Sequence, residues 1–468
     1  MTDNKNILLL IPPYYEYIYG SAVMKSVTSR SYMVLSLGIL AAHLRKANHN
    51  VMILDLNLFD NTDKKLSDTL RGFKPQIAGI SSTSPIFWLA CKYAETIKQH
   101  SREIVTVIGG VHPTIFPSAS LENNQFDIAV VGEGEESIVQ IAGGVPLETI
   151  KGIAYKTGSK INVTPARTKY IDLNTSPIPA YDLYEVAKYI HPKAVAKNSP
   201  VTSMETSRGC FGQCSFCNMR KTPFRFKTYE RILEEIEYVL SLGYREIHFL
   251  DDNIAANPKR AKELCSAIIK RGLKFSWQPR GGVRVDSVDL ELFKLMKQSG
   301  AWTVPFGIES GNQDILDLNM KNIKLEQVRK AVSWAKEAGL RTEGYFMIGL
   351  MGETEATIKD SIEFSKSLDL DLAKFAITIP LPGTPMFDEW DKQGLIKTKD
   401  WSKYIFSTSP SKIFSHPNLS KEMIDTYYYK SHRDFYFRPK YILKSIIASF
   451  KNGDVIDNIK TFFKTKWY

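Results

Sequence analysis

Short apolar runs alternate with amphipathic helical stretches in the first part of this chain, and this alternation restricts the folds it can adopt. Residues 6–13 (NILLLIPP) and 50–56 (NVMILDL) have the continuous apolar character of buried strands, and residues 35–49 between them have the spacing of an amphipathic helix. Five such strand-like runs precede residue 142. Because buried strands joined by helices pair in parallel, the pattern predicts an α/β fold with a doubly wound, Rossmann-like sheet over residues 1–142.

Small and polar residues follow the strands of this predicted sheet. In doubly wound sheets, ligands bind beyond the carboxyl ends of the strands, and small residues there let a ligand approach the backbone closely. His112 precedes Pro113 in a turn, which favours a hydrogen-bonding role in the loop over ligation of a metal. The sequence therefore predicts a cofactor site at these strand ends, formed by Ser81, Ser82, Gly109, Gly110, Val111, His112, Gly132, Glu133 and Gly134.

A second series of strands and helices occupies residues 201–390. Six strand–helix units in this length predict a partial (β/α)6 barrel, which is shorter than a closed barrel. A hairpin and a proline-punctuated linker at 143–200 precede it, and an aromatic, basic and mostly helical segment at 391–468 follows it. The loops after barrel strands usually carry the chemistry, and the unusual residues of this region all fall there. They are Cys210, Cys214, Cys217, Asp251, Asp252, Arg280, Glu309 and Gly349.

Three of the five cysteines of the 468-residue chain stand at positions 210, 214 and 217. Structural zinc sites close with four ligands, and no second CxxC pair is available here. A four-iron, four-sulfur cluster held by three thiolates instead leaves one iron open for a substrate or cofactor. The spacing favours such a cluster, with a zinc site or an incidental group of thiols as the alternatives. Cys91 and Cys265 fall in helical patterns and are predicted to be buried, and this sparse usage fits a reducing cytoplasm.

The CxxxCxxC string, with Phe216 before its last cysteine, resembles the radical S-adenosylmethionine (SAM) superfamily. The resemblance continues through FLDDN, GIESG, GLMGET and PLPGTP and covers residues 200–390. The strings GGVHPT and VVGEGEES resemble the cobalamin-binding domain that precedes this barrel in the methyltransferase and tetrapyrrole-cyclase branch. Two departures stand out. The DxHxxG string that supplies a cobalt-binding histidine in many such domains is absent, and Met351 stands where proline is usual.

The resemblance implies three cofactors: a [4Fe-4S] cluster, SAM, and cobalamin bound without a protein histidine. Cys210, Cys214 and Cys217 would ligate the irons, and the open iron would bind the amino and carboxylate groups of SAM. The resemblance also places the Phe216 backbone against the adenine, Asp251 and Asp252 at the methionine ammonium, Glu309 at the ribose hydroxyls, and Arg280 at the methionine carboxylate.

Three of these assignments have structural alternatives. Asp251 and Asp252 are also typical of a solvated turn after a strand. Glu309 is also placed to cap the next helix, and an arginine such as Arg280 commonly forms a surface ion pair.

The activity implied by the resemblance is C-methylation of an unactivated carbon. A 5′-deoxyadenosyl radical would remove hydrogen from the substrate, and methylcobalamin would deliver the methyl group. The implied partners are a small-molecule or lipid-like substrate and an external electron donor such as flavodoxin or ferredoxin. Oxidative cyclisation or rearrangement, as in anaerobic tetrapyrrole cyclases, is the alternative within the family. A zinc- or cobalamin-binding sensor that contacts nucleic acid would suit the net charge of +11, but the sequence contains no nucleic-acid-binding module.

The last segment has two interpretations. Ile442, Leu443, Ile446, Ile447 and Phe450 share one helical face, which favours packing against the barrel. Nearby lysines offer the alternative that this face lies on a membrane and meets a lipid-like substrate. No apolar run reaches the roughly 20 residues that a transmembrane helix needs.

Overall fold

The computed structural model describes residues 4–19, 32–123, 125–193, 195–220, 222–405 and 412–452. The chain divides into two compact units. The first comprises residues 1–203, 234–245 and 400–407, and the second comprises residues 204–233, 246–399 and 408–468.

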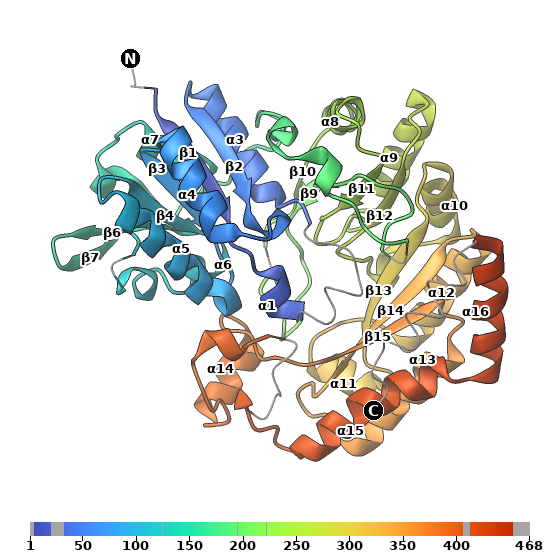
Figure 1. The fold of residues 1–468 in the computed structure, drawn as a ribbon. Coiled ribbons are helices and arrows are strands. Elements are labelled where there is room, and N and C mark those ends of the chain that lie inside the picture. Colours follow the sequence, from blue (N-terminus) through green and yellow to red (C-terminus); the bar gives the residue numbers. More distant parts are fainter. Residues whose placement is uncertain are drawn as a thin grey trace. The chain divides into compact units, whose positions relative to one another are not determined.

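The first unit is built on a seven-stranded sheet with the order β2-β1-β3-β4-β5-β6-β7 (Figure 1). The first five strands pair in parallel, as expected from their buried runs and the helices between them. The hairpin β6–β7 adds to the edge of the same sheet by antiparallel pairing with β5, although the sequence placed it in a linker. The strands are β1 (Asn6–Ile11), β2 (Asn50–Asp55), β3 (Ile77–Ser81), β4 (Val105–Gly109), β5 (Ile128–Val130), β6 (Ile153–Thr157) and β7 (Lys160–Val163).

Helices cover both faces of this sheet. Helix α3 packs with α7, and α4 packs with α5. Leu8, Ile80 and Ile108 from three neighbouring strands join Ala94 and Ile97 of α5 in one buried apolar cluster. The helices are α1 (Tyr15–Tyr19), α3 (Leu35–Lys46), α4 (Thr62–Phe73), α5 (Phe87–His100), α6 (Val111–Ile115) and α7 (Glu135–Ala142).

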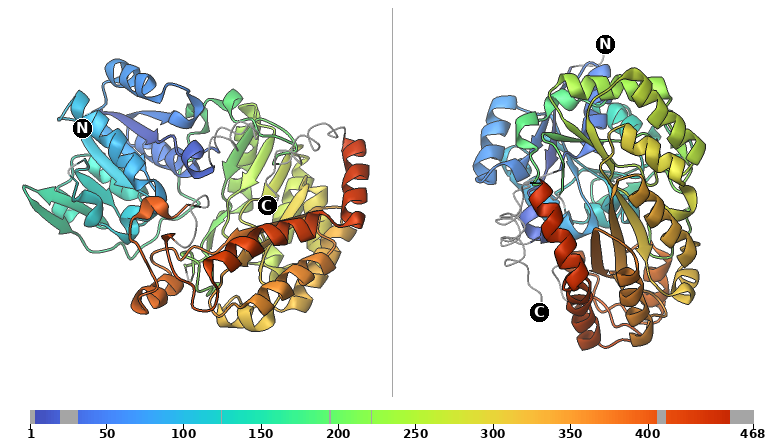
Figure 2. Two further views of the ribbon diagram at one scale, coloured as in Figure 1. Left: turned by 60° about the horizontal axis from the view of Figure 1, so that its bottom comes forward. Right: turned by 90° about the vertical axis from the view of Figure 1, so that its right-hand side faces the viewer.

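The barrel consists of two three-stranded sheets, with the orders β12-β11-β8 and β13-β14-β15. Parallel bridges between Trp277 and Ala301 and between Val283 and Phe306 continue one sheet into the other. The expected six strands are therefore present in a partial barrel, and Figure 2 shows their helices on the outer side. The strands are β8 (Val201–Met204), β11 (Glu246–Phe249), β12 (Ser276–Pro279), β13 (Thr303–Glu309), β14 (Arg341–Ile348) and β15 (Leu372–Ile377).

The helices of this region follow the strands in regular alternation, as the sequence predicted. Asn257 and Asp289 begin two of them by accepting a hydrogen bond from a backbone N–H of the first turn. The helices are α8 (Tyr229–Ser241), α9 (Pro258–Arg271), α10 (Leu290–Gln298), α11 (Gln313–Leu318), α12 (Leu325–Glu337), α13 (Glu355–Ser367) and α14 (Pro385–Lys392).

Two further helices, α15 (Lys421–Tyr436) and α16 (Pro439–Asn452), complete the second unit. The Tyr436 hydroxyl at the end of α15 donates to the carbonyl of Ala373 in β15 at 2.7 Å. Figures 1 and 2 show α16 at the periphery of this unit. Among the described residues, no helix combines the length and apolar character needed to cross a bilayer.

The prediction that the apolar face of α16 packs on the barrel is wrong for four of its residues. The side chains of Ile442, Leu443, Ile446 and Ile447 are 39 to 61 % exposed, because the opposite face of the helix contacts the rest of the unit. The side chain of Phe450, and Asp454, Asp457, Lys460, Lys464 and Lys466, lie outside the described residues.

Candidate active site

A short antiparallel ladder closes the base of the loop that contains the three cysteines. Strands β9 (Ser207–Arg208) and β10 (Arg225–Phe226) pair on either side of it. Gly209 begins the loop with φ at +99°, and a Cβ there would lie 2.1 Å from the carbonyl oxygen of Pro223. Only glycine satisfies both the backbone conformation and this close approach.

Backbone groups inside the loop point at two of the cysteine sulfurs. The Gly212 N–H donates to Cys210 Sγ at 3.3 Å, and the Met219 N–H donates to Cys217 Sγ at 3.4 Å. Cys214 is buried, whereas Cys210 and Cys217 are half-buried. Such N–H···S contacts favour thiolates and are typical of the surroundings of iron–sulfur clusters.

The electrostatic surroundings of Cys214 contain two cations. Burial raises the pKa of its thiol, and the positive charges of Lys321 and Arg284 oppose that rise. Burial is also the main cause that raises the pKa of Cys217, and the charges of the other two cysteines add to it. In the described part of the chain, no three His, Cys, Asp or Glu side chains converge closely enough for a single metal ion. Three thiols with a cationic border are a donor set that fits a multi-iron cluster.

Lys321 and Arg284 were not identified from the sequence. The Nζ of Lys321 lies 2.8 Å from Glu309 Oε1, and both side chains are almost fully buried. An Nη of Arg284 donates to the carbonyls of Lys321 and Asn322 at 3.1 and 3.2 Å. Met320 and Asn322 on either side of Lys321 both have positive φ, at +53° and +54°. Non-glycine residues rarely adopt this conformation, and two of them around a buried lysine mark a specialised loop.

The loop that contains Lys321 also bonds to Ser215, which lies between Cys214 and Cys217. The Ser215 N–H and hydroxyl donate to the backbone and side-chain oxygens of Asn319, both at 3.0 Å. The Asn319 amide in turn donates to the carbonyl of Met351 at 3.0 Å. Phe216 follows Ser215 and is half-buried. The residues between α11 and α12 therefore hold both the cysteine loop and the loop after β14.

Asp251 and Asp252, at the end of β11, hold the start of the cysteine loop. Asp251 is buried and accepts hydrogen bonds from Thr206 N–H at 3.0 Å, Thr206 Oγ1 at 2.6 Å and Ser207 Oγ at 2.5 Å. Asp252 Oδ2 accepts from the Gly209 N–H at 2.9 Å. Burial raises the pKa of both carboxyl groups, and these hydrogen bonds oppose the rise. Both residues thus hold the backbone segment 206–209 that leads into Cys210.

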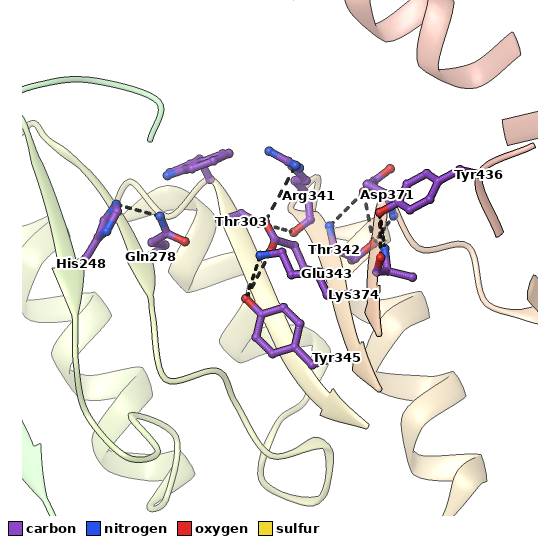
Figure 3. A network of polar contacts seen from close by, with 12 residues as sticks. His248, Gln278, Thr303, Arg341, Thr342, Glu343, Tyr345, Asp371, Lys374 and Tyr436 are labelled. Atoms are coloured by element: carbon purple, nitrogen blue, oxygen red, sulfur yellow. Dashed lines mark hydrogen bonds and ion pairs between the residues drawn. The ribbon is translucent and has the colours of Figure 1, made fainter. Parts of the chain in front are cut away.

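Side chains at alternate positions of β11 and β12 point to opposite sides of the sheet. Phe249 and Trp277 face α9 and α10, where they line an apolar cavity. The neighbouring residues His248 of β11 and Gln278 of β12 point to the other side of the sheet and carry polar groups (Figure 3). Gln278 Nε2 lies 2.7 Å from His248 Nε2, which lies 3.0 Å from Glu246 Oε1.

A second part of this polar network surrounds Glu343 of β14 (Figure 3). Lys374 Nζ lies 3.1 Å from one carboxylate oxygen, and the Tyr345 hydroxyl donates to the same oxygen at 3.3 Å. Burial raises the pKa of Glu343, but Lys374, Arg341 and Arg280 outweigh it and lower the pKa overall. Arg280 also lowers the pKa of His248, together with burial. The charge of Arg280 therefore acts within this network, whereas Arg284 and Lys321 act on Cys214.

In the first unit, the loops after β3 and β4 pack tightly against each other. Gly110 has φ at +104°, and a Cβ there would lie 2.6 Å from the carbonyl oxygen of Ser82. The Ser82 N–H donates to the carbonyl of Gly109 at 2.9 Å, and the His112 N–H donates to the carbonyl of Ser82 at 3.3 Å. Ser81 ends β3 beside Gly109 in the sheet register.

Beyond this contact, the carboxyl ends of β4 and β5 are open. A Cβ added at Gly109 or at Gly132 would meet no atom within 4 Å, and Val111 is exposed. A Cβ at Gly134 would lie 3.4 Å from Val130 and 3.6 Å from Leu40, and the Glu133 carboxylate accepts from the Ile171 N–H at 3.4 Å. Open backbone at the ends of parallel strands fits a large cofactor.

His112 lies in α6 beneath this edge. It is buried, its Nδ1 lies 3.1 Å from Ser84 Oγ, and its ring stacks on Phe87 with centroids 4.0 Å apart. Burial lowers the pKa of its imidazole to about 4. Asp55 and Asn57, at the place comparable to DxHxxG, bond to each other at 2.8 Å. These residues suit cobalamin that receives no histidine from the protein.

Comparison with known proteins identifies the family to which the chain belongs. The family described as the radical SAM superfamily matches residues 204–365, and the B12 binding domain matches residues 24–142. An uncharacterized methyltransferase of Pyrococcus horikoshii is 33% identical over 94% of both chains. An anaerobic magnesium-protoporphyrin IX monomethyl ester cyclase of Rubrivivax gelatinosus is 28% identical over 79% of this chain and 68% of its own. Cytidylyl-2-hydroxyethylphosphonate methyltransferase of Streptomyces wedmorensis is 28% identical over 78% of this chain and 79% of its own.

Two solved structures share the fold. The radical SAM methyltransferase TsrM of Kitasatospora setae, with cobalamin and a [4Fe-4S] cluster bound, has a TM-score of 0.69 at 17% identity and covers 84% of this chain and 78% of its own. The cobalamin-dependent radical SAM enzyme OxsB, with aqua-cobalamin and SAM bound, has a TM-score of 0.73 at 16% identity and covers 98% of this chain and 72% of its own. The chain therefore belongs to the cobalamin-binding-domain family of radical SAM enzymes, whose cofactors are a [4Fe-4S] cluster, SAM and cobalamin.

Proposed function

We propose that this enzyme transfers a methyl group to an unactivated carbon of a small-molecule substrate. The observation that carries the proposal is the 33% identity, over 94% of both chains, to a protein named as a methyltransferase. When bound, the cluster with SAM supplies a carbon-centred radical, and cobalamin supplies the methyl group. The protein supplies orientation and exclusion of water.

Each part of the cysteine loop has a proposed role. Cys210, Cys214 and Cys217 would hold the cluster, and Asp252 would orient Cys210 through Gly209. Phe216 would flank the adenine of SAM. Asp251 would support the start of the loop through its hydrogen bonds to Thr206 and Ser207. The buried pair of Glu309 and Lys321 borders Cys214 and is a further candidate for contact with SAM.

We also propose which segments of the chain bind each cofactor and which connect them. The strand ends of residues 1–142 would hold cobalamin, and residues 201–390 would hold the cluster and SAM. Residues 143–200 would connect these regions, and residues 391–468 would add to the barrel.

Arg280, expected to pair with the methionine carboxylate, is a candidate for substrate binding because its charge acts on His248 and Glu343. An external donor such as flavodoxin or ferredoxin would deliver electrons in the cytoplasm.

The proposal can be tested before the substrate is known. Protein loaded with iron, sulfide and cobalamin under anaerobic conditions is reduced and incubated with SAM whose methyl group carries deuterium. A methyltransferase of this kind moves the labelled methyl group onto cobalamin, and mass spectrometry of the extracted cobalamin detects it. The matched control is Gly109→Val, which places a side chain in the open edge of β4.

The similarity to the Rubrivivax cyclase favours oxidative cyclisation as a second candidate. In that case, reduced enzyme cleaves SAM to deoxyadenosine, but no label reaches cobalamin. A protein that yields neither product contradicts both candidates.

A further inference from the structure

Helix α16 presents an apolar face that the rest of its unit leaves exposed. Ile442, Leu443, Ile446 and Ile447 occupy positions that fall on one side of a helix, and their side chains are 39 to 61 % exposed. Phe437, two residues before the helix begins, is also exposed. Single exposed apolar residues are common, but a row of branched residues over two helical turns marks an interaction surface.

The opposite side of α16 is firmly attached to the second unit. The Tyr441 hydroxyl donates to the carbonyl of Asp371 at 2.8 Å, and Lys444 Nζ lies 2.8 Å from Asp369 Oδ1 and 3.0 Å from Asp371 Oδ1. Just before the helix, an Nη of Arg438 donates to the carbonyl of Lys366 at 2.6 Å. The helix is therefore held by its polar residues while the four apolar residues named above face outward, which is the reverse of an ordinary surface helix.

The charges that α16 itself carries are positive, and one of them, Lys444, is paired with Asp369 and Asp371. The sequence of α16 contains three lysines and no acidic residue, and Lys440 in its first turn is exposed. An apolar row with the exposed Lys440 at its border matches the interface of a bilayer that contains anionic lipids.

We propose that α16 rests in the surface of an anionic membrane. Ile442, Leu443, Ile446 and Ile447 enter the boundary between headgroups and acyl chains, and Lys440 contacts lipid phosphates. The enzyme thereby works at a membrane through the outer face of this helix. This inference concerns where the enzyme acts and does not depend on the proposed reaction.

Flotation of the full-length, cluster-loaded protein with vesicles tests the proposal. One set of vesicles contains equal parts of phosphatidylcholine and phosphatidylglycerol, and a second contains phosphatidylcholine alone. We expect binding to the first set only, and we expect added salt to weaken it because salt screens the lysine–phosphate attraction.

Variants assign the binding to this helix. Replacing the four apolar residues by serine should lower the partition coefficient at least about 10-fold, because binding scales with buried apolar area. The change Lys440→Glu should lower it severalfold on anionic vesicles. The matched control is Ile269→Ser on α9, which removes an apolar residue that is 38 % exposed in the same unit and should change nothing.

Other occupants of this face give different results. If a chain that ends at Asn452 loses its binding, residues 453–468 carry the contact, and the assignment to α16 is wrong. A dimer in light scattering that the serine variant dissociates would identify a second copy as the occupant and overturn the proposal. Equal binding to neutral vesicles, or no binding to either set, also overturns it.

Discussion

Lys321 Nζ lies 2.8 Å from Glu309 Oε1, both side chains are largely buried, and their charges act on Cys214. Burial lowers the pKa of Lys321, but the charges of Glu309 and Cys214 outweigh that effect and raise it overall. Lys321 therefore stays charged next to a thiol that would ligate iron. Glu309 adopts φ of +67°, which the surrounding contacts must enforce.

Lys321→Met should destabilise the protein and shift the cluster potential. Removing one member of a buried ion pair costs about 3–5 kcal/mol, because the remaining charge is left unpaired. A cation lost near the cluster should make its reduction potential more negative by on the order of 50–100 mV. EPR-monitored titration measures the potential. Lys324→Met, which removes an exposed lysine three residues away, should leave both unchanged.

Gly209→Ala should prevent assembly of the cluster. The new Cβ would lie 2.1 Å from the Pro223 carbonyl oxygen and would push the start of the cysteine loop away from its place. Iron and sulfide content after anaerobic reconstitution should fall to a small fraction of the wild-type value. Gly243→Ala separates this clash from backbone strain, since Gly243 has the same φ of +99° with open space around it. Normal iron content in Gly209→Ala would show that the close approach is unimportant.

Gly109→Val should weaken cobalamin binding without unfolding the first unit. The side chain enters open space at the end of β4, where no atom lies within 4 Å, so the fold itself should tolerate it. We expect at least about a 10-fold higher Kd for cobalamin, measured by the change in its absorbance spectrum, because the added side chain removes contact area. Gly72→Val adds a side chain in equally open space on α4 and should bind cobalamin normally.

Bound cob(II)alamin should carry no histidine from this protein. His112 is buried, its ring stacks on Phe87, and its Nδ1 lies 3.1 Å from Ser84 Oγ, so the imidazole is held inside the fold. A coordinated histidine nitrogen splits the cobalt EPR lines in a pattern that depends on the nitrogen isotope. Spectra of protein made with ¹⁴N- or ¹⁵N-histidine should therefore be identical. A difference between them would contradict the prediction.

Glu353 should make stability fall as pH rises from about 4.5 to about 7. Burial raises its pKa from 4.5 to about 7, although the N–H groups of Gly349 and Leu350 oppose the rise. Between these values the folded state binds more protons than the unfolded state, so the stability present at low pH is lost as pH rises. The full effect is about 3 kcal/mol.

Glu353→Gln imitates the protonated side chain and removes this dependence. At pH 4 it should be about as stable as the wild type, and at pH 8 it should be more stable by up to about 3 kcal/mol. Proteolysis of the full-length protein across a urea series measures both values. A constant difference between the two proteins at both pH values would show that Glu353 keeps its ordinary pKa.

The sequence predicted the α/β architecture and the kind of cofactor well, because both depend on local patterns. Buried strand runs and helical periodicity are set by residues a few positions apart. Cys210, Cys214 and Cys217 lie within one loop, so their spacing alone limits the metal chemistry. The addition of β6 and β7 to the first sheet depends on distant pairing with β5, and a hairpin pattern does not specify its partner.

The sequence by itself thus determined which chemistry the chain can support, since ligand spacing and strand periodicity depend on residues only a few positions apart in the sequence. Only the tertiary structure brought Lys321 and Arg284 to Cys214, fixed Asp251 beneath the loop, and turned the apolar face of α16 outward. These results depend on contacts between segments far apart in the chain and on positive φ values at Met320 and Asn322. A helix face is buried only if other segments of the folded chain pack against it, and the sequence of the helix alone does not specify those segments.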